Sequence, residues 1–187
     1  PWAPQPVPEW LDYEMWLGPA PWAPYHKDRC LYSFRFIRDY SGGNVTNLGA
    51  HMIDMVQWAT GHDHTMPVEV EDLGGVFSTA GLFDVADPAH FRCRYEDGTE
   101  FECHTGHRFA WVKFEGERGW LALDDRITAS SPALLRARIE PGERRLRESD
   151  DHMRDFLDCV RSRRDPVAPV EVGHRSAAIC HLGNIAM

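Results

Sequence analysis

Residues 68–125 consist of short segments in which apolar and polar residues alternate, with no helical pattern between them. Asp97-Gly98 separates two of these segments and favours a tight hairpin, because a type I′ turn needs a positive φ at both central residues. Strands joined by short turns pair antiparallel, since a parallel pair needs a long crossover. The sequence therefore predicts a largely antiparallel sheet. The expected strands are 68–78, 90–96, 99–105, 109–114 and 119–123, with one or two more within 127–137.

Helical patterns lie on both sides of this block. Residues 45–60 place apolar side chains three and four positions apart, which is typical of an amphipathic helix. Ser149-Asp150-Asp151 is expected to cap a second helix, and a final helix is expected from near Glu171. A further strand is expected at 31–38. Residues 31–187 are therefore predicted to form an α+β domain, an open and largely antiparallel sheet with helices on one face.

The N-terminal segment has a different composition. Residues 1–24 hold seven of the 13 prolines and four of the seven tryptophans. Proline fixes φ and removes a backbone donor, so regular sheet is not expected there. Residues 9–17 are expected to form a short helix that ends at Gly18. Residues 1–30 are therefore predicted to be a proline- and tryptophan-rich connecting arm that lies against a neighbouring body.

Charge and hydropathy exclude two classes of partner. The 29 acidic and 20 basic residues give a net charge of -9, which repels a nucleic-acid backbone. No apolar run is long enough to span a bilayer. The five cysteines contain no C-x-x-C pair and are expected to be free thiols of a cytoplasmic protein, with one Cys93–Cys103 disulfide as an alternative. Because the chain begins with Pro1, it reads as an excised piece, and an export signal could have been removed.

A pair of glycines opens the helix expected at 45–60. Gly42-Gly43 permits a sharp turn in which the main chain comes close to a ligand, and Thr46 or Asn47 is the expected helix cap. His51 lies one turn into this helix, near the end where backbone N–H groups attract electronegative atoms. Imidazole exchanges protons near neutral pH, so His51 is a candidate general acid or base.

Other polar side chains accompany His51. Asn47 and Asp54 lie three or four positions from it on the same helix face. The Asn47 amide could hold a substrate oxygen, and Asp54 could orient the imidazole or cap a backbone group. Tyr40 beside the glycine turn could contact a sugar or pack beneath the turn. The alternative for His51 and Asp54 is a purely structural hydrogen-bonded pair. No third ligand accompanies any histidine pair, so no metal site is predicted.

Several segments together resemble one oxidoreductase family. The stretch 42–54, from Gly42-Gly43 through Asn47 and His51 to Asp54, resembles the glycine turn and helix of the C-terminal domain of the glucose-fructose oxidoreductase/inositol dehydrogenase (Gfo/Idh/MocA) family. Further segments that agree are 16–21, 39–43, 54–58, 114–120, 172–176 and 182–186. The likeness runs nearly end to end and implies the dihydrodipicolinate reductase-like C-terminal fold of that family.

The resemblance implies a function and a missing partner. Family members oxidise or reduce a sugar or cyclitol carbon with NAD or NADP, which an N-terminal Rossmann domain binds. This chain has no strand followed by G-x-G-x-x-G, so no cofactor-binding residues are expected in it and it is expected to be inactive alone. By the same resemblance His51 has the acid/base role. Position 47 faces the substrate and is Asn here, where the family commonly has Asp.

Three functions are open at this point. The first is the substrate-binding and oligomerisation domain of an NAD(P)-dependent sugar or cyclitol oxidoreductase. In that case the second sheet face is expected to pair with another copy, since an uncovered apolar face needs a partner. The second is a domain of an NAD-dependent glycosidase or lyase that acts by transient oxidation. The third is a non-catalytic assembly module, consistent with Asn47.

Overall fold

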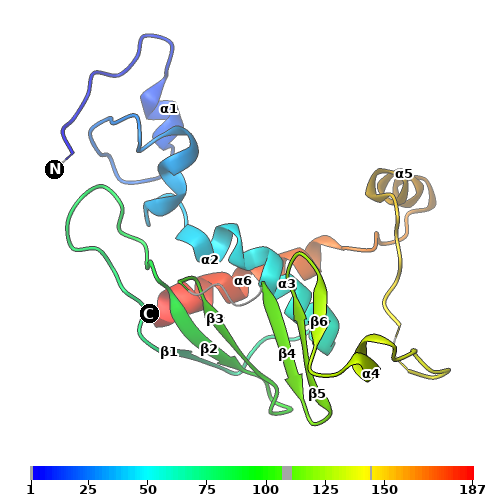
Figure 1. The fold of residues 1–187 in the computed structure, drawn as a ribbon. Coiled ribbons are helices and arrows are strands. Elements are labelled where there is room, and N and C mark those ends of the chain that lie inside the picture. Colours follow the sequence, from blue (N-terminus) through cyan, green and yellow to red (C-terminus); the bar gives the residue numbers. More distant parts are fainter. Residues whose placement is uncertain (1, 107–110, 144) are drawn as a thin grey trace. The chain divides into compact units, whose positions relative to one another are not determined.

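The computed structural model describes residues 2–106, 111–143 and 145–187 (Figure 1). These residues form two compact units. The first contains residues 2–53, 66–106 and 177–187, and the second contains residues 54–65, 111–143 and 145–176. Two of the unit boundaries fall within helices, α3 (Gly49–Thr60) and α6 (Val170–Ala186). The boundary of the arm at residue 30 stays a prediction.

A three-stranded antiparallel sheet forms the centre of the first unit. Its strands are β1 (Glu69–Asp72), β2 (His90–Arg94) and β3 (Glu100–His104), in that order. β2 and β3 are joined by a hairpin at the expected place, in which Gly98 has a φ of 87° and its N–H donates to the Tyr95 carbonyl at 3.1 Å. Asp97 does not have a positive φ, so the turn is not the type I′ turn that the sequence predicted. The antiparallel pairing and the position of this hairpin are confirmed.

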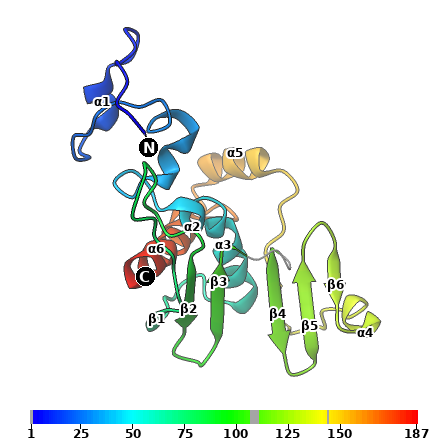
Figure 2. The ribbon, with the colours of Figure 1, turned by 60° about the vertical axis from the view of Figure 1, so that its left-hand side comes forward.

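Helices cover one face of this sheet. Phe91 and Cys93 of β2 are fully buried and pack in one cluster with Ile53 of α3 and with Ile179 and Cys180 of α6. Figure 2 shows the C-terminal part of α6 lying along the same sheet. Burial of these apolar side chains is the main stabilising contribution in this unit. The expected α+β arrangement, with helices on one face, is confirmed.

The opposite face of the same sheet is charged. Arg92 donates to Glu102 at 2.8 Å and lies 3.5 Å from Glu71, while Arg94 pairs with Glu69. These pairs are exposed, so each contributes little to stability. This outer face is therefore not the uncovered apolar surface that the sequence led us to expect opposite the helices.

Three thiols lie together in the core of the first unit. The five cysteines form no disulfide, so the alternative Cys93–Cys103 pairing is wrong. Burial raises the pKa of Cys93 and of Cys180 to about 12 and the pKa of Cys103 to about 11. These thiols are protonated at neutral pH, which makes them poor nucleophiles. They pack as small apolar side chains.

The segment expected as a strand at 31–38 is instead a 3-10 helix, η1 (Leu31–Phe36). Alternating Tyr32, Phe34 and Phe36 predicted the strand, but the backbone is satisfied locally. The Ile37 N–H donates to the Phe34 carbonyl at 3.0 Å, and the Tyr40 N–H donates to the Ile37 carbonyl at 2.9 Å. No strand in the described part of the chain pairs with this segment. An alternating pattern makes a strand only where a neighbouring strand can take up its backbone groups.

The arm has a small core of its own. Its helix α1 (Tyr13–Leu17) is capped by Asp12, which accepts from the Met15 N–H at 3.0 Å, and it ends at Gly18 as expected. Tyr13 and Leu17 pack in one buried cluster with two residues further along the arm, Tyr25 and Cys30. Aromatic contacts thus replace regular sheet in this proline-rich segment.

The second unit contains another antiparallel sheet. Its strands are β4 (Val112–Gly116), β5 (Gly119–Leu123) and β6 (Ile127–Ala129), followed by α4 (Pro132–Leu135) and α5 (His152–Ser162). The expected sheet is therefore two sheets, and positions 109 and 110 of one expected strand lie outside the described residues. Asp151 caps α5 as predicted, accepting from the Arg154 N–H at 2.9 Å.

Candidate functional site

Both glycines of the turn before α2 (Gly43–Asn47) lie where a side chain would not fit. Gly43 has a φ of 68°, and a Cβ there would lie 2.8 Å from a Val85 methyl. A Cβ at Gly42 would overlap the Asn184 amide, whose Nδ2 donates to the Gly42 carbonyl at 3.0 Å. The glycines therefore allow α6 to approach the turn closely. The side chains of Asn184 and Val85 fill the space beside the two glycines, so the turn does not form an open cradle for a ligand.

The helix begins earlier than expected and is nearly continuous into α3. It starts at Gly43, so neither Thr46 nor Asn47 is its cap; the Thr46 hydroxyl instead accepts from the Gly42 N–H at 3.1 Å. Leu48 joins the two helices in a helical conformation, and the His51 N–H donates to its carbonyl at 3.1 Å. Asn47 and His51 are therefore about one helical turn apart, and both side chains are exposed.

A pocket of about 470 Å³ lies in the first unit beside α2. It brings together two of the residues predicted from the sequence, Tyr40 and Asn47, and adds side chains from η1 and from α6. Its other lining residues are Tyr32, Phe34, Arg35, Ser41, Thr46, Ala177 and His181. A volume of this size lies in the range of small-molecule sites.

The other two predicted residues lie outside this lining. His51 is exposed on the first turn of α3. Asp54 accepts a hydrogen bond from the Ser176 hydroxyl of α6 at 2.7 Å, so its carboxylate joins two helices of the second unit.

Sequence reasoning missed the two basic side chains of the pocket, Arg35 and His181. His181 lies three positions before Asn184 on α6, on the face that meets the glycine turn, but only the structure reveals that contact. The alternating pattern of residues 31–38 predicted a strand, and a strand there gave no indication that Arg35 lines this pocket.

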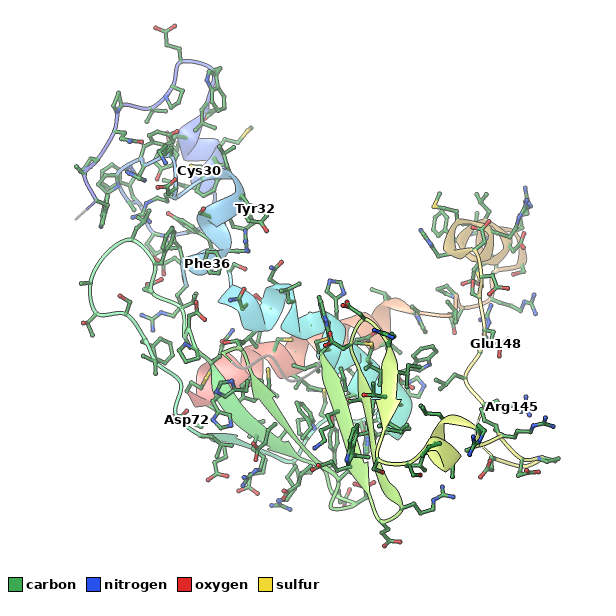
Figure 3. All side chains as sticks on the ribbon, in the orientation of Figure 1. Cys30, Tyr32, Phe36, Asp72, Arg145 and Glu148 are labelled. Carbon is green, nitrogen blue, oxygen red and sulfur yellow. The ribbon has the colours of Figure 1, made fainter. Side chains whose placement is uncertain are left out.

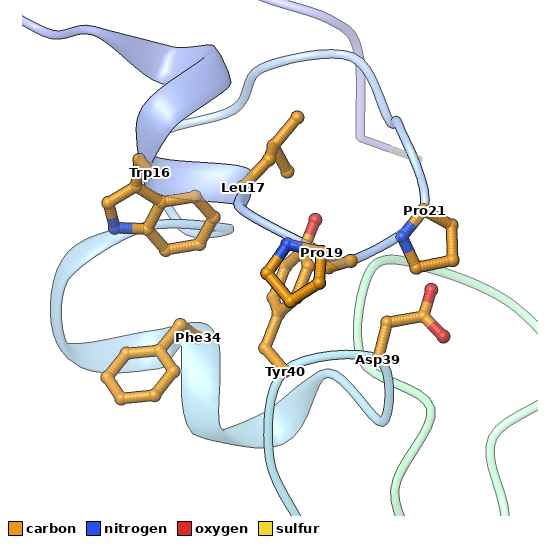
Figure 4. Close-up of a pocket in the computed structure, with 8 residues that line it drawn as sticks. Trp16, Leu17, Pro19, Pro21, Phe34, Asp39 and Tyr40 are labelled. Carbon is orange, nitrogen blue, oxygen red and sulfur yellow. The ribbon is translucent and has the colours of Figure 1, made fainter.

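A second pocket, of about 500 Å³, adjoins the first and shares Phe34 and Tyr40 with it (Figure 4). The Trp16 and Tyr40 rings meet edge to face at 5.2 Å, and the Tyr40 hydroxyl accepts from Arg29 at 3.2 Å. Asp39 supplies a carboxylate, and the rest of the lining is apolar: Leu17, Pro19, Ala20 and Pro21. Tyr40 thus lines both pockets: the aromatic one, which contains the Asp39 carboxylate, and the polar one, which contains Arg35 and His181.

A metal-binding cluster and a membrane-spanning helix are both absent from the described part of the chain. No three His, Cys, Asp or Glu side chains of residues 2–106, 111–143 and 145–187 are grouped so that they could hold a metal ion. Within the same ranges, no helix combines the length and the apolar character needed to cross a membrane.

Comparison with known proteins gives one finding. Residues 2–187 match a family model described as "Oxidoreductase family, C-terminal alpha/beta domain". No curated protein matches the chain.

Proposed function

The chain belongs to the Gfo/Idh/MocA oxidoreductase family as its C-terminal alpha/beta domain, and we propose that it is the substrate-binding domain of an NAD(P)-dependent sugar or cyclitol oxidoreductase. The observation that carries this proposal is the pocket lined by Tyr40 and Asn47 at the glycine turn. Its mixture of aromatic rings with hydroxyl and amide groups suits a polyhydroxylated ligand.

Each predicted site residue has a role in this proposal. Asn47 holds a substrate hydroxyl with its amide, which donates and accepts but takes up no proton. Tyr40 presents its ring to the sugar while its hydroxyl is held by Arg29. His51, exposed one turn beyond Asn47, exchanges the proton of the reacting hydroxyl. The Asp54 carboxylate already accepts a hydrogen bond from the Ser176 hydroxyl. A contact between Asp54 and the substrate is not tested by this hydrogen bond and stays a prediction.

The glycine turn at Gly42 and Gly43 does not fit the pyrophosphate of a dinucleotide. A pyrophosphate needs a glycine turn that leaves backbone N–H groups open at a helix start. Here the space beside Gly42 and Gly43 is filled by Asn184 and Val85. We therefore propose that NAD or NADP is bound by a separate N-terminal Rossmann domain, which supplies the redox chemistry.

Sugar-dependent reduction of the cofactor tests this function. The full-length protein, supplied with NAD+ or NADP+ and a panel of sugars and cyclitols, is expected to accumulate NADH or NADPH, read by absorbance. Cleavage of a glycoside without net cofactor reduction would replace this proposal with the glycosidase or lyase. Neither activity on any substrate of the panel would favour the assembly module.

A homo-oligomer is also proposed, through the sheet of the second unit. The β4–β5–β6 register places Phe114, Leu121, Leu123 and Ile127 on one face, and Ile127 is 62% exposed. Phe114, Leu121 and Leu123 are partly buried. A partly uncovered apolar face of this kind favours self-association. Ile127→Asp is expected to convert an oligomer to monomer in sedimentation velocity, whereas Thr128→Asp on the other face is not. Equal effects of the two variants would locate the interface elsewhere.

A further inference from the structure

We propose that the pocket between η1, α2 and α6 binds an anionic group, so that the ligand is an acidic sugar carrying a carboxylate or a phosphate. This inference rests on the proposed function for the sugar part of the ligand. The anion-binding part rests on the charge, the donors and the geometry of the pocket itself.

The lining of this pocket contains a cation and no carboxylate. Arg35 contributes a guanidinium, His181 an imidazole, and Asn47 an amide; no Asp or Glu is among the lining residues. The chain as a whole has 29 acidic residues against 20 basic ones. A positive pocket in an acidic protein attracts anions locally, because nearby charges dominate over distant, screened ones.

Arg35 is held in place by aromatic rings rather than by a counter-ion. Its guanidinium carbon lies 3.4 Å from the centre of the Tyr32 ring and 4.5 Å from the centre of the Phe36 ring. Figure 3 labels both aromatic residues on η1. One terminal nitrogen, Nη1, donates to the Tyr32 carbonyl. No carboxylate of the described residues pairs with Arg35, and its Nε–H is buried without a hydrogen bond among them.

A stacked guanidinium with unused donors is suited to an oxyanion. Arginine has five N–H donors in a fixed plane and binds carboxylate or phosphate through two of them at once. Stacking on Tyr32 fixes that plane before the ligand arrives, which lowers the ordering cost of binding.

Further polar groups line the site. The Thr46 hydroxyl donates to the Gly43 carbonyl at 3.2 Å and lies 3.5 Å from the Ser41 hydroxyl, and the exposed His181 ring lines the same pocket from α6. Asn47 adds a neutral amide to the lining. An aspartate there would place a negative charge in the pocket and repel an anion.

The adjoining pocket gives the ligand a direction. Asp39 lines the aromatic pocket on the far side of Phe34 and Tyr40, and it is the one carboxylate in either lining. The acidic end of the ligand therefore lies at Arg35 and the uncharged end lies toward Asp39. Charge of opposite sign at the two ends sets orientation more than affinity.

Calorimetric titration of the full chain with three probes tests this inference: D-glucuronate, D-glucose 6-phosphate and uncharged D-glucose. At least one anion is expected to bind about tenfold or more tightly than glucose. Arg35→Gln is expected to abolish that preference. Arg38→Gln is the matched control, because it removes an exposed arginine of the same segment that lines neither pocket, and it is expected to change affinity less than twofold.

Two further variants keep the test decisive. His181→Gln is expected to weaken anion binding severalfold, and it stands in for Arg35→Gln if that variant does not fold. Asn47→Asp is expected to weaken the binding of both anions more than the binding of glucose, because the added charge repels only the anions. If the binding of D-glucuronate depends on Arg35, the site takes a carboxylate. If the binding of D-glucose 6-phosphate depends on Arg35, the site takes a phosphate.

Some outcomes overturn this inference alone. Equal binding of glucose and both anions would do so, as would equal effects of Arg35→Gln and Arg38→Gln. Arg35-dependent anion binding by a protein that oxidises no sugar would instead overturn the proposed function and leave the anion site standing.

Discussion

Alanine in place of His51 is expected to lower the turnover of the full-length protein by about 10²–10⁴-fold, the usual contribution of a general acid or base. Oxidising an alcohol carbon requires the hydroxyl proton to leave. His51 is the histidine of α3, one turn beyond Asn47, and its side chain is exposed. Its loss removes the proton acceptor and leaves the pocket lining unchanged.

The decrease is expected in kcat rather than in KM, because His51 is not among the residues that line the pocket. His64→Ala, at another exposed histidine, serves as the control and should keep turnover within about twofold of the parent. Unchanged turnover in His51→Ala would remove His51 from the mechanism and favour the assembly module.

Local patterns account for the parts of the fold that the sequence predicted. Gly98 specifies its turn through the positive φ that glycine adopts readily, and Asp151 specifies the start of α5 by accepting from the Arg154 N–H three positions away. The hairpin turn and the start of α5 each depend only on residues that are close in the sequence. The apolar face of β2, with Phe91 and Cys93, alternates as expected because its burial follows from a period of two.

Parts that depend on distant contacts were not predictable. The alternation of residues 31–38 is compatible with a strand, and only the absence of a neighbouring strand decides for η1. The difference between a strand and a 3-10 helix also changes the candidate site. In a strand Tyr32 and Arg35 would lie on opposite faces, whereas side chains three apart are eclipsed in a 3-10 helix. That eclipsing is what stacks Arg35 on Tyr32.

The candidate site shows the same division. Tyr40 and Asn47 were predicted together because one turn and one short helix separate them, and the structure places both in one pocket. His181 reaches the same pocket from the last helix of the chain. That approach depends on the packing of α6 against the glycine turn, through Asn184 and Gly42. No local pattern near residue 47 reports this contact.

Replacing Gly183 by alanine is expected to destabilise the first unit by about 1–3 kcal/mol, the usual cost of overpacking a filled core. A Cβ at this position would lie 2.7 Å from Cε2 of Phe91 and closer still to Cζ. Phe91 is fully buried in the main cluster, so its ring has little room to move. A loss of 2 kcal/mol corresponds to a fall in Tm of about 4–8 °C for a chain of this length.

The same substitution elsewhere on α6 gives the matched control with the opposite sign. A Cβ at Gly173 meets no atom within 4 Å, and the residue is exposed. Gly173→Ala should therefore stabilise the helix by up to about 1 kcal/mol, since alanine loses less backbone entropy than glycine. Thermal unfolding followed by circular dichroism measures both changes. If Gly183→Ala raised Tm as Gly173→Ala does, α6 would not pack on Phe91 as described, and the approach of His181 to the pocket would lose its structural basis.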